Sequence, residues 1–368
     1  MILKRNAGQR YNQRILIINP FGIGDVLFTT PLVSAIRQNF PQAFIGYWCN
    51  ERVEAVLRNN PDINKVFALS RGDIKKIYKK SWLKGVSESL KLFRALKKER
   101  FDTVFDFSLD HRYGLVSRLI GAKQRIGFNY KNRGKFLTKK IDIDGFHGKH
   151  IVEFYLDLLR ICGIEQKSAD LKLGVSNPAK ESVKNLLGRF GVRAGDMVVG
   201  IAPGAGGSWG KDAVLKHWPA LKFALLADRI LEDLKAKVLI IGDESERPIA
   251  NTIFEAMKHK PIDLTGKTSL EEFAAIMGKL KVLVTNDGGP MHMAVALGTK
   301  TVSIFGPVDE KVYGPYPKTE QHIVVKEEIF CRPCYKNFRM PKCQRDRECI
   351  KSIEVDKVFE AVREVLKA

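Results

Sequence analysis

The stretch from Lys281 to Pro307, KVLVTNDGGPMHMAVALGTKTVSIFGP, concentrates residue types that can bind a phosphate. Two apolar, β-branched runs, Val282–Thr285 and Thr301–Phe305, flank a glycine turn and a short helix, which is typical of a βαβ unit. Glycines let the backbone approach a ligand, and a helix N-terminus presents free amides to a phosphate. The stretch therefore predicts a diphosphate site. The alternative is that Asp287 only caps the helix and His292 only packs under it.

A carboxylate stands beside a second glycine turn near the N-terminus. A predicted buried strand, Arg14–Asn19, leads into Gly22 and Gly24, which match the first two glycines of the dinucleotide-binding pattern G-x-G-x-x-G. Leu27 occupies the third position, so the match is incomplete. Asp25 lies at the start of the following helix, where it could accept a proton from a substrate hydroxyl or only cap the helix.

A third glycine-rich loop follows the predicted strand Met197–Ala202. The segment Pro203–Lys211, PGAGGSWGK, precedes KHWP and a long predicted helix. Such a loop can cradle a phosphate, although the P-loop spacing G-x-x-x-x-G-K-[ST] is absent. Lys216 could neutralise a leaving diphosphate as a point charge, or it could be a solvated residue before the helix.

Strands alternate with helical segments along the whole chain. Its 368 residues suit two domains, with further strands predicted at 43–49, 65–69, 103–107, 124–128, 237–242 and 262–266. This alternation favours an α/β fold with doubly wound parallel sheets, in which ligands bind beyond the carboxyl ends of the strands. We expect domains at 1–190 and 191–368, the second ending in the Cys cluster 331–349 and a closing helix.

The chain is strongly basic, with a formal charge of +21 and a pI near 9.7. This charge implies an anionic partner, whether nucleic acid, an acidic membrane or a phosphorylated substrate. Segment 71–100 predicts a basic amphipathic helix that either lies on an anionic membrane or packs its apolar stripe on the core. A second basic run, 123–140, includes Arg125 and contains no acid. No membrane-spanning run and no signal peptide are visible, so we expect a cytoplasmic location.

Four cysteines follow one another near the C-terminus in the pattern C-x2-C-x8-C-x5-C: Cys331, Cys334, Cys343 and Cys349. A cytoplasmic location disfavours disulfides. The cluster could hold a structural zinc ion, or the residues could be free thiols or conditional disulfides.

Four motifs, GIGD, PGAGGSW with KHWP, LTGKTSLEEFAAIM and TNDGGPMHMAVALGTKTVSIFGP, resemble in that order the ADP-heptose:lipopolysaccharide heptosyltransferases of glycosyltransferase family 9. The similarity extends from about residue 14 to 367. It implies the GT-B architecture, in which two Rossmann-like domains face each other across a cleft. The first binds the acceptor and the second binds the nucleotide sugar. It further implies an inverting transfer that needs no cofactor for its chemistry, with ADP-heptose as the expected donor.

The resemblance also implies roles for individual residues. Asp25 would be the general base, and Lys216 would bind the leaving diphosphate. Ser208, Asp287, Gly288, Gly289 and His292 would complete the donor site, and Gly22, Gly24 and Arg125 would contact the acceptor. Two departures concern the donor: Gly288 stands where many relatives have threonine, and the loop before Lys216 is longer and richer in glycine, leaving Ser208 as its main hydroxyl.

The expected acceptor is an anionic, lipid-linked molecule of the lipopolysaccharide core type, bound at the inner face of the cytoplasmic membrane by a peripheral enzyme. No nucleic acid partner is expected. The alternative is a non-catalytic polyanion or nucleotide-sugar binding protein with a zinc module. Asp25 discriminates between them, because a binding protein has no need of a carboxylate beside the acceptor.

Overall fold

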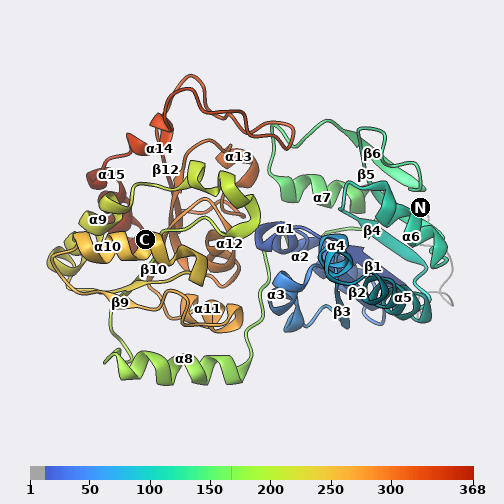
Figure 1. Ribbon diagram of the computed structural model, residues 1–368, viewed down its shortest axis with the longest axis horizontal. Coiled ribbons are helices and arrows are strands. Elements are labelled where there is room, and N and C mark those ends of the chain that lie inside the picture. Colours follow the sequence, from blue (N-terminus) through green and yellow to red (C-terminus); the bar gives the residue numbers. More distant parts are fainter. Residues whose placement is uncertain (1–12, 167) are drawn as a thin grey trace. The chain divides into compact units, whose positions relative to one another are not determined.

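The computed structural model describes residues 13–166 and 168–368, apart from the side chains of Arg71, Ser208 and Lys211. The chain forms two compact units, Met1–Gly174 and Val175–Ala368 (Figure 1). The division precedes helix α8 (Asn177–Arg189), which packs against α11 (Leu270–Met277) in the second unit. The expected boundary assigned this helix to the first domain. An apolar stripe shows that a helix is covered on one side, but not which sheet or helix covers it.

The first unit contains a six-stranded parallel sheet in the order β3-β2-β1-β4-β5-β6. Its strands are β1 (Arg14–Ile18), β2 (Phe44–Cys49), β3 (Lys65–Ala68), β4 (Thr103–Asp106), β5 (Gln124–Tyr130) and β6 (Lys139–Ile143). Residues 15–18 are completely buried, as expected for a strand covered on both faces. Strand β6 was not predicted. It is an edge strand of alternating exposed and half-buried residues, and its lysines hide the short apolar pattern.

Eight helical segments accompany these strands in the described part of the first unit, the last of them after β6. They are α1 (Ile23–Phe28), α2 (Thr30–Asn39), η2 (Glu51–Val53), α3 (Glu54–Arg58), α4 (Arg71–Lys80), α5 (Trp82–Lys98), α6 (His111–Leu119) and α7 (Ile151–Arg160). The one helix expected at Asp25 is in fact two helices, α1 and α2. Pro31, which has no amide proton to donate, lies in the first turn of α2 and marks the break.

The second unit repeats the plan with a parallel sheet in the order β12-β11-β10-β7-β8-β9. Its strands are β7 (Val198–Ala202), β8 (Lys237–Ile240), β9 (Ile262–Asp263), β10 (Val282–Asn286), β11 (Lys300–Phe305) and β12 (His322–Lys326). Besides α8 and α11, its helical segments are η3 (Gly207–Lys216), α9 (Ala220–Asp233), η4 (Glu244–Glu246), α10 (Arg247–Ala256), α12 (Gly289–Ala296), α13 (Glu310–Tyr313), α14 (Glu348–Lys351) and α15 (Val355–Lys367).

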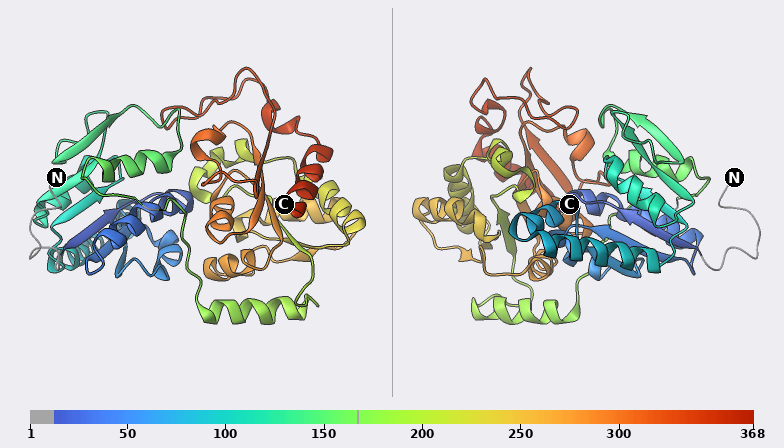
Figure 2. Two further views of the ribbon diagram at one scale, coloured as in Figure 1. Left: turned by 180° about the vertical axis from the view of Figure 1, so that it is seen from behind. Right: turned by 45° about the vertical axis from the view of Figure 1, so that its right-hand side comes forward.

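One large apolar core holds the second unit together. Residues of α9, α10 and α15 pack on the same face of this sheet. The left view of Figure 2 shows this unit from behind. Trp218 is completely buried there, and its indole Nε1 donates a hydrogen bond to Ile353 O at 3.0 Å. The closing helix is therefore part of the core of this unit. No described helix is long and apolar enough to cross a membrane.

Candidate functional site

In the first unit, Asp25 is fixed in the turn that follows β1. Gly22 N donates to Asp25 Oδ2 at 3.1 Å, and Asn19 Nδ2 donates to Asp25 O at 2.9 Å. Asn19 is itself buried and accepts a hydrogen bond from Phe21 N through Oδ1 at 3.2 Å. The carboxylate therefore caps α1, and it is also half-buried at the carboxyl end of a central strand. The capping role and the proposed catalytic role are compatible.

A residue that the sequence analysis did not identify, Asn50, braces this turn from the neighbouring strand. It follows β2, and its Nδ2 donates to Pro20 O at 3.0 Å and to Phe21 O. Asn50 is buried. Its signal in the sequence is an amide residue directly after a buried strand, at the sheet edge where ligands bind.

A second acidic residue that the sequence analysis overlooked ends the next strand. Asp106 pairs in register with Ile18, and burial raises the pKa of its carboxyl group to about 6. Ser108 N donates to its Oδ1 at 2.9 Å. Asp106 lines an open pocket together with His111, Arg133, Phe136 and other residues of unit 1. The same edge of the sheet thus carries the Asp25 turn and, one strand away, a pocket with acidic, basic and aromatic walls.

Arg125 was predicted to bind the acceptor. Its guanidinium group donates hydrogen bonds to backbone carbonyl groups of nearby residues. Nε donates to Phe136 O at 2.6 Å, and Nη1 donates to Ala122 O. Burial and the nearby Arg118 lower the pKa of Arg125. In this structure Arg125 braces the connection between β5 and β6, whereas Arg133 of the same basic run lines the pocket. Gly22 and Gly24 lie in the Asp25 turn, as expected.

In the second unit, Lys216 and Asp287 form a buried ion pair. Nζ of Lys216 lies 2.8 Å from Asp287 Oδ2, with side chains 4% and 6% exposed. This separation is that of a charge-assisted contact between ammonium and carboxylate. Nζ also lies 4.3 Å from the centre of the Trp209 ring. Lys216 is thus not the solvated surface residue of the alternative interpretation.

Asn286, the last residue of β10, holds the glycine-rich loop in place. Its Oδ1 accepts from Trp218 N at 3.0 Å, and its Nδ2 donates to Pro203 O at 2.6 Å. Both ends of the segment that carries Lys216 are therefore attached to the strand that precedes Asp287. Asn286 was not among the predicted site residues.

The glycines of this region make room for other parts of the protein. A Cβ atom at Gly288 would lie 2.8 Å from Ala205 O, so the N-terminus of α12 and the glycine-rich loop touch through their backbones. A Cβ atom at Gly204 would overlap Glu246, whose Oε1 accepts from Gly206 N at 3.3 Å. Burial raises the pKa of Glu246. The loop therefore encloses a carboxyl group that the sequence analysis did not identify.

Three further residues, Gly289, His292 and Ser208, were predicted to bind the donor. Gly289 begins α12, and His292 is buried within that helix, on its second turn. The side chain of Ser208 lies outside the described part of the structure. The structure thus brings Lys216 into contact with Asp287 and places Gly288 against the loop before Lys216.

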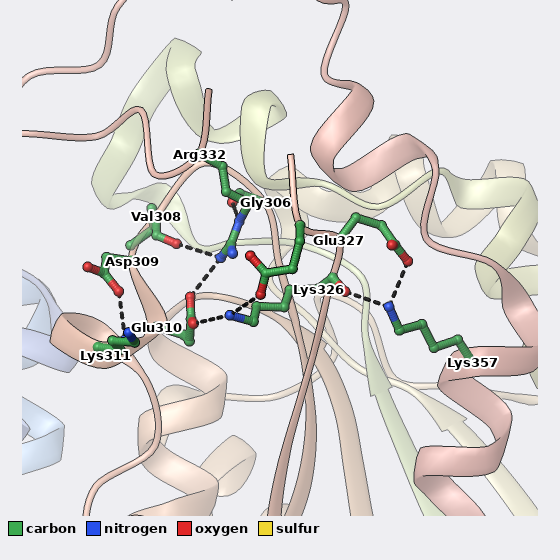
Figure 3. A network of polar contacts seen from close by, with 10 residues as sticks. Gly306, Val308, Asp309, Glu310, Lys311, Lys326, Glu327, Arg332 and Lys357 are labelled. Atoms are coloured by element: carbon green, nitrogen blue, oxygen red, sulfur yellow. Dashed lines mark hydrogen bonds and ion pairs between the residues drawn. The ribbon is translucent and has the colours of Figure 1, made fainter. Parts of the chain in front are cut away.

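A network of ion pairs fixes the segment that carries the cysteines (Figure 3). Arg332 donates to Gly306 O at 2.7 Å, to Val308 O at 3.1 Å and to Glu310 Oε2 at 2.8 Å. Burial alone would raise the pKa of Glu310, but hydrogen bonds from Lys326 and Arg332 lower it to about 2.

This anchored segment reaches the donor-site candidate through one aromatic contact. The ring of Tyr335 packs 4.7 Å from the ring of Trp209, which lies against Lys216. Tyr313 also packs on Tyr335, at 5.9 Å between ring centres. The cysteine segment therefore forms part of the wall around the buried lysine.

The zinc site predicted for the four cysteines stays a prediction. Among residues 13–166 and 168–368, no three His, Cys, Asp or Glu side chains are arranged to hold a metal ion. Cys334 Sγ donates to Cys331 O at 3.1 Å, and Cys343 Sγ, on an exposed residue, accepts from Arg347 N at 3.2 Å. Burial, reinforced by the neighbouring thiols, raises the pKa of Cys349 to about 11. These are four free cysteines, and spacing alone did not determine how their thiols point.

Comparisons with known proteins agree on one family. Residues 89–344 match glycosyltransferase family 9 (heptosyltransferase). Lipopolysaccharide heptosyltransferase 3 of Escherichia coli K12 is 27% identical over 297 residues, covering 80% of this chain and 82% of that protein. A family 9 glycosyltransferase from Veillonella parvula superposes with a TM-score of 0.82 at 24% identity, covering 96% of this chain and 97% of that one. E. coli ADP-heptose lps heptosyltransferase II superposes with a TM-score of 0.74 at 21% identity, covering 96% and 99%.

These matches confirm the family resemblance carried by the four motifs, and the two parallel-sheet units confirm the predicted GT-B class of fold. The matched region extends from within α5 into the cysteine segment and so includes Lys216, Asp287 and the α12 turn. The chain is therefore a glycosyltransferase that belongs to family 9, the heptosyltransferase family.

Proposed function

We propose that this protein transfers a heptose from ADP-heptose to an anionic acceptor of the lipopolysaccharide core type, with inversion at the anomeric carbon. The observation that carries the proposal is the buried Lys216–Asp287 pair beside the N-terminus of α12. The carboxylate and the aromatic ring hold this lysine charged and in a fixed position, from which its ammonium can contact a diphosphate. The names of the similar proteins support the choice of heptose, of ADP-heptose as donor and of lipopolysaccharide as acceptor.

The bond between the anomeric carbon and the diphosphate breaks as the new glycosidic bond forms. Negative charge then builds on the departing diphosphate, and a fixed ammonium and helix amides aimed at it stabilise the transition state. Lys216 supplies the ammonium, and the amides at the start of α12 supply the dipole end. This arrangement needs no cofactor for the chemistry.

Asp25 takes the proton from the attacking hydroxyl group of the acceptor. The proton moves to the carboxylate as the hydroxyl oxygen bonds to the anomeric carbon, so charge balances at the acceptor. The hydrogen bond from Gly22 N orients this carboxylate at the strand edge. The first unit therefore binds the acceptor and the second unit binds the nucleotide sugar. The basic run that contains Arg125 and Arg133 would attract the anionic acceptor, and the enzyme would act at the inner face of the cytoplasmic membrane.

The test is release of nucleoside diphosphate from a panel of nucleotide sugars that includes ADP-heptose, with truncated lipopolysaccharide core as acceptor. We expect release that requires the acceptor and that falls by about 10²-fold or more in Asp25→Asn, because the amide cannot take up the proton. The matched control is Asp144→Asn, which neutralises a carboxylate of the same unit that is 86% exposed. Release with a different donor would change the substrate but not the mechanism. Full activity of Asp25→Asn would refute the role of Asp25, and no release from any donor would refute the proposed function.

A further inference from the structure

The tip of the α4–α5 hairpin exposes two large apolar side chains next to each other. Trp82 is 68% exposed and Leu83 is 74% exposed, at the first turn of α5. Leu90, two turns further along, is 46% exposed. Apolar exposure of this size on neighbouring residues has a cost in water and marks a contact surface.

The rest of α5 shows that this exposure is local. Leu92, Phe93, Ala95 and Leu96, in the second half of the helix, pack on the core of the first unit. The apolar stripe predicted for the segment is thus buried at one end of α5 and uncovered at the other. A helix that only covered the core would need no tryptophan and leucine on its outer end.

The hairpin holds the tip in a defined position. α4 and α5 pack on each other, and a Cβ atom at Gly85 would lie 2.6 Å from the ring of Tyr78, so the two helices cross closely there. Ser81 ends α4 and caps α5, accepting a hydrogen bond from Lys84 N at 3.4 Å. Trp82 and Leu83 therefore project from a packed corner of two helices.

Basic residues surround the apolar tip. Lys79, Lys80 and Lys84 are exposed on either side of Trp82 and Leu83. From Lys75 to Lys98 the sequence contains nine lysines and arginines and one acid, Glu88. An aromatic and an aliphatic side chain within a ring of lysines matches the interface of an anionic bilayer, where the apolar groups enter the headgroup region and the lysines contact acidic lipids.

From these observations we infer that the α4–α5 tip, residues 79–84, docks the enzyme on an anionic lipid bilayer by inserting Trp82 and Leu83. A second copy of the chain is a poorer occupant, because it would bring two lysine-ringed tips together. A nucleic acid would satisfy the lysines but not the leucine. The inference names the membrane-binding residues of the proposed function, but its test measures binding and not turnover.

The test compares wild type with Trp82→Ala/Leu83→Ala in co-sedimentation with vesicles of phosphatidylglycerol and phosphatidylcholine, and of phosphatidylcholine alone. We expect wild type to bind the acidic vesicles and the double variant to bind them at least tenfold more weakly. The matched control, Leu221→Ala/Leu225→Ala, removes two leucines of α9 that are 59% and 55% exposed, and we expect it to bind like wild type. A third variant, Lys79→Gln/Lys80→Gln/Lys84→Gln, should lose most of the salt-sensitive part of the binding.

Three results would overturn the inference. One is a Trp82→Ala/Leu83→Ala variant that binds acidic vesicles as well as wild type does. The second is a wild-type protein that self-associates without lipid and becomes monomeric in this variant. The third is equal loss of binding in the α9 control. An unchanged unfolding temperature shows that the variant folds. Its turnover on a delipidated acceptor should equal that of wild type, and a wild type without turnover would refute the proposed function while leaving the vesicle result intact.

Discussion

The buried pair of Lys216 and Asp287 makes the substitution Asp287→Asn a direct test of the donor site. The substitution keeps the shape of the side chain and leaves the Lys216 ammonium buried without its counter-charge. Removing one partner of a buried ion pair costs about 3–5 kcal/mol. The Trp209 ring at 4.3 Å retains part of the stabilisation of the cation. We therefore expect a loss of about 3 kcal/mol, toward the lower end of that range.

For a unit of this size, such a loss lowers the unfolding temperature by about 6–12 °C. Thermal unfolding followed by circular dichroism measures it. The double variant Lys216→Met/Asp287→Asn removes both charges and should recover most of the loss, because no unpaired charge remains buried. A loss below about 1 kcal/mol in Asp287→Asn would refute the reasoning, because it is the loss expected for an ion pair exposed to solvent and not for a buried one.

Added ADP separates a donor-binding role from a purely structural one. In wild type the diphosphate competes with Asp287 for Lys216, whereas in Asp287→Asn it supplies the missing negative charge. We expect ADP to bind Asp287→Asn about tenfold more tightly than wild type and to raise its unfolding temperature by more. Equal or weaker binding of ADP to Asp287→Asn, measured by calorimetry, would show that Lys216 does not contact the diphosphate.

Two further predictions concern the neighbourhood of this site. The pKa of Glu310 is about 2 instead of the ordinary 4.5, so its contribution to stability is complete above about pH 4.5 and is lost as the pH falls toward 2. Glu310→Gln should therefore lower the stability at neutral pH and flatten the acid side of a profile of stability against pH. An acid side as steep as that of wild type would contradict this. Gly288→Ala would place a methyl group 2.8 Å from Ala205 O, so we expect ADP to bind this variant at least tenfold more weakly. The control Gly188→Ala meets open space in α8 and should stabilise the chain by up to about 1 kcal/mol. Unchanged ADP binding in Gly288→Ala would show that the loop moves aside freely.

The sequence was sufficient for the strands that are buried on both faces and for the glycine turns that follow them. Apolar, β-branched runs such as 15–18 and 282–284 have one stable environment, the middle of a covered parallel sheet. Edge strand β6 was not predicted, because an exposed strand has no continuous apolar run. The compact units divide after Gly174 rather than at residue 190, because the packing of α8 on α11 places this helix with the second unit.

The candidate site was predictable as a set of residue types, but not as a set of contacts. Lys216 and Asp287 are far apart in the sequence, and only the fold makes them a pair. Arg125 has the charge expected of an acceptor ligand, yet carbonyl groups nearby in the chain occupy its guanidinium. Asp106 and Glu246 were not predicted, because an acid at the end of a strand or in the short helical turn after it is common and its burial becomes visible only in the structure.

The contiguity of the two units has a consequence for how the chain is made. Every strand of the first sheet comes from the first 143 residues, and every strand of the second comes from residues after 197. During synthesis the first sheet can therefore close while the second is still being translated, because no strand of the first sheet pairs with a strand of the second. Nascent chains that contain only Met1–Gly174 are thus expected to acquire protease resistance on the ribosome before the second unit emerges.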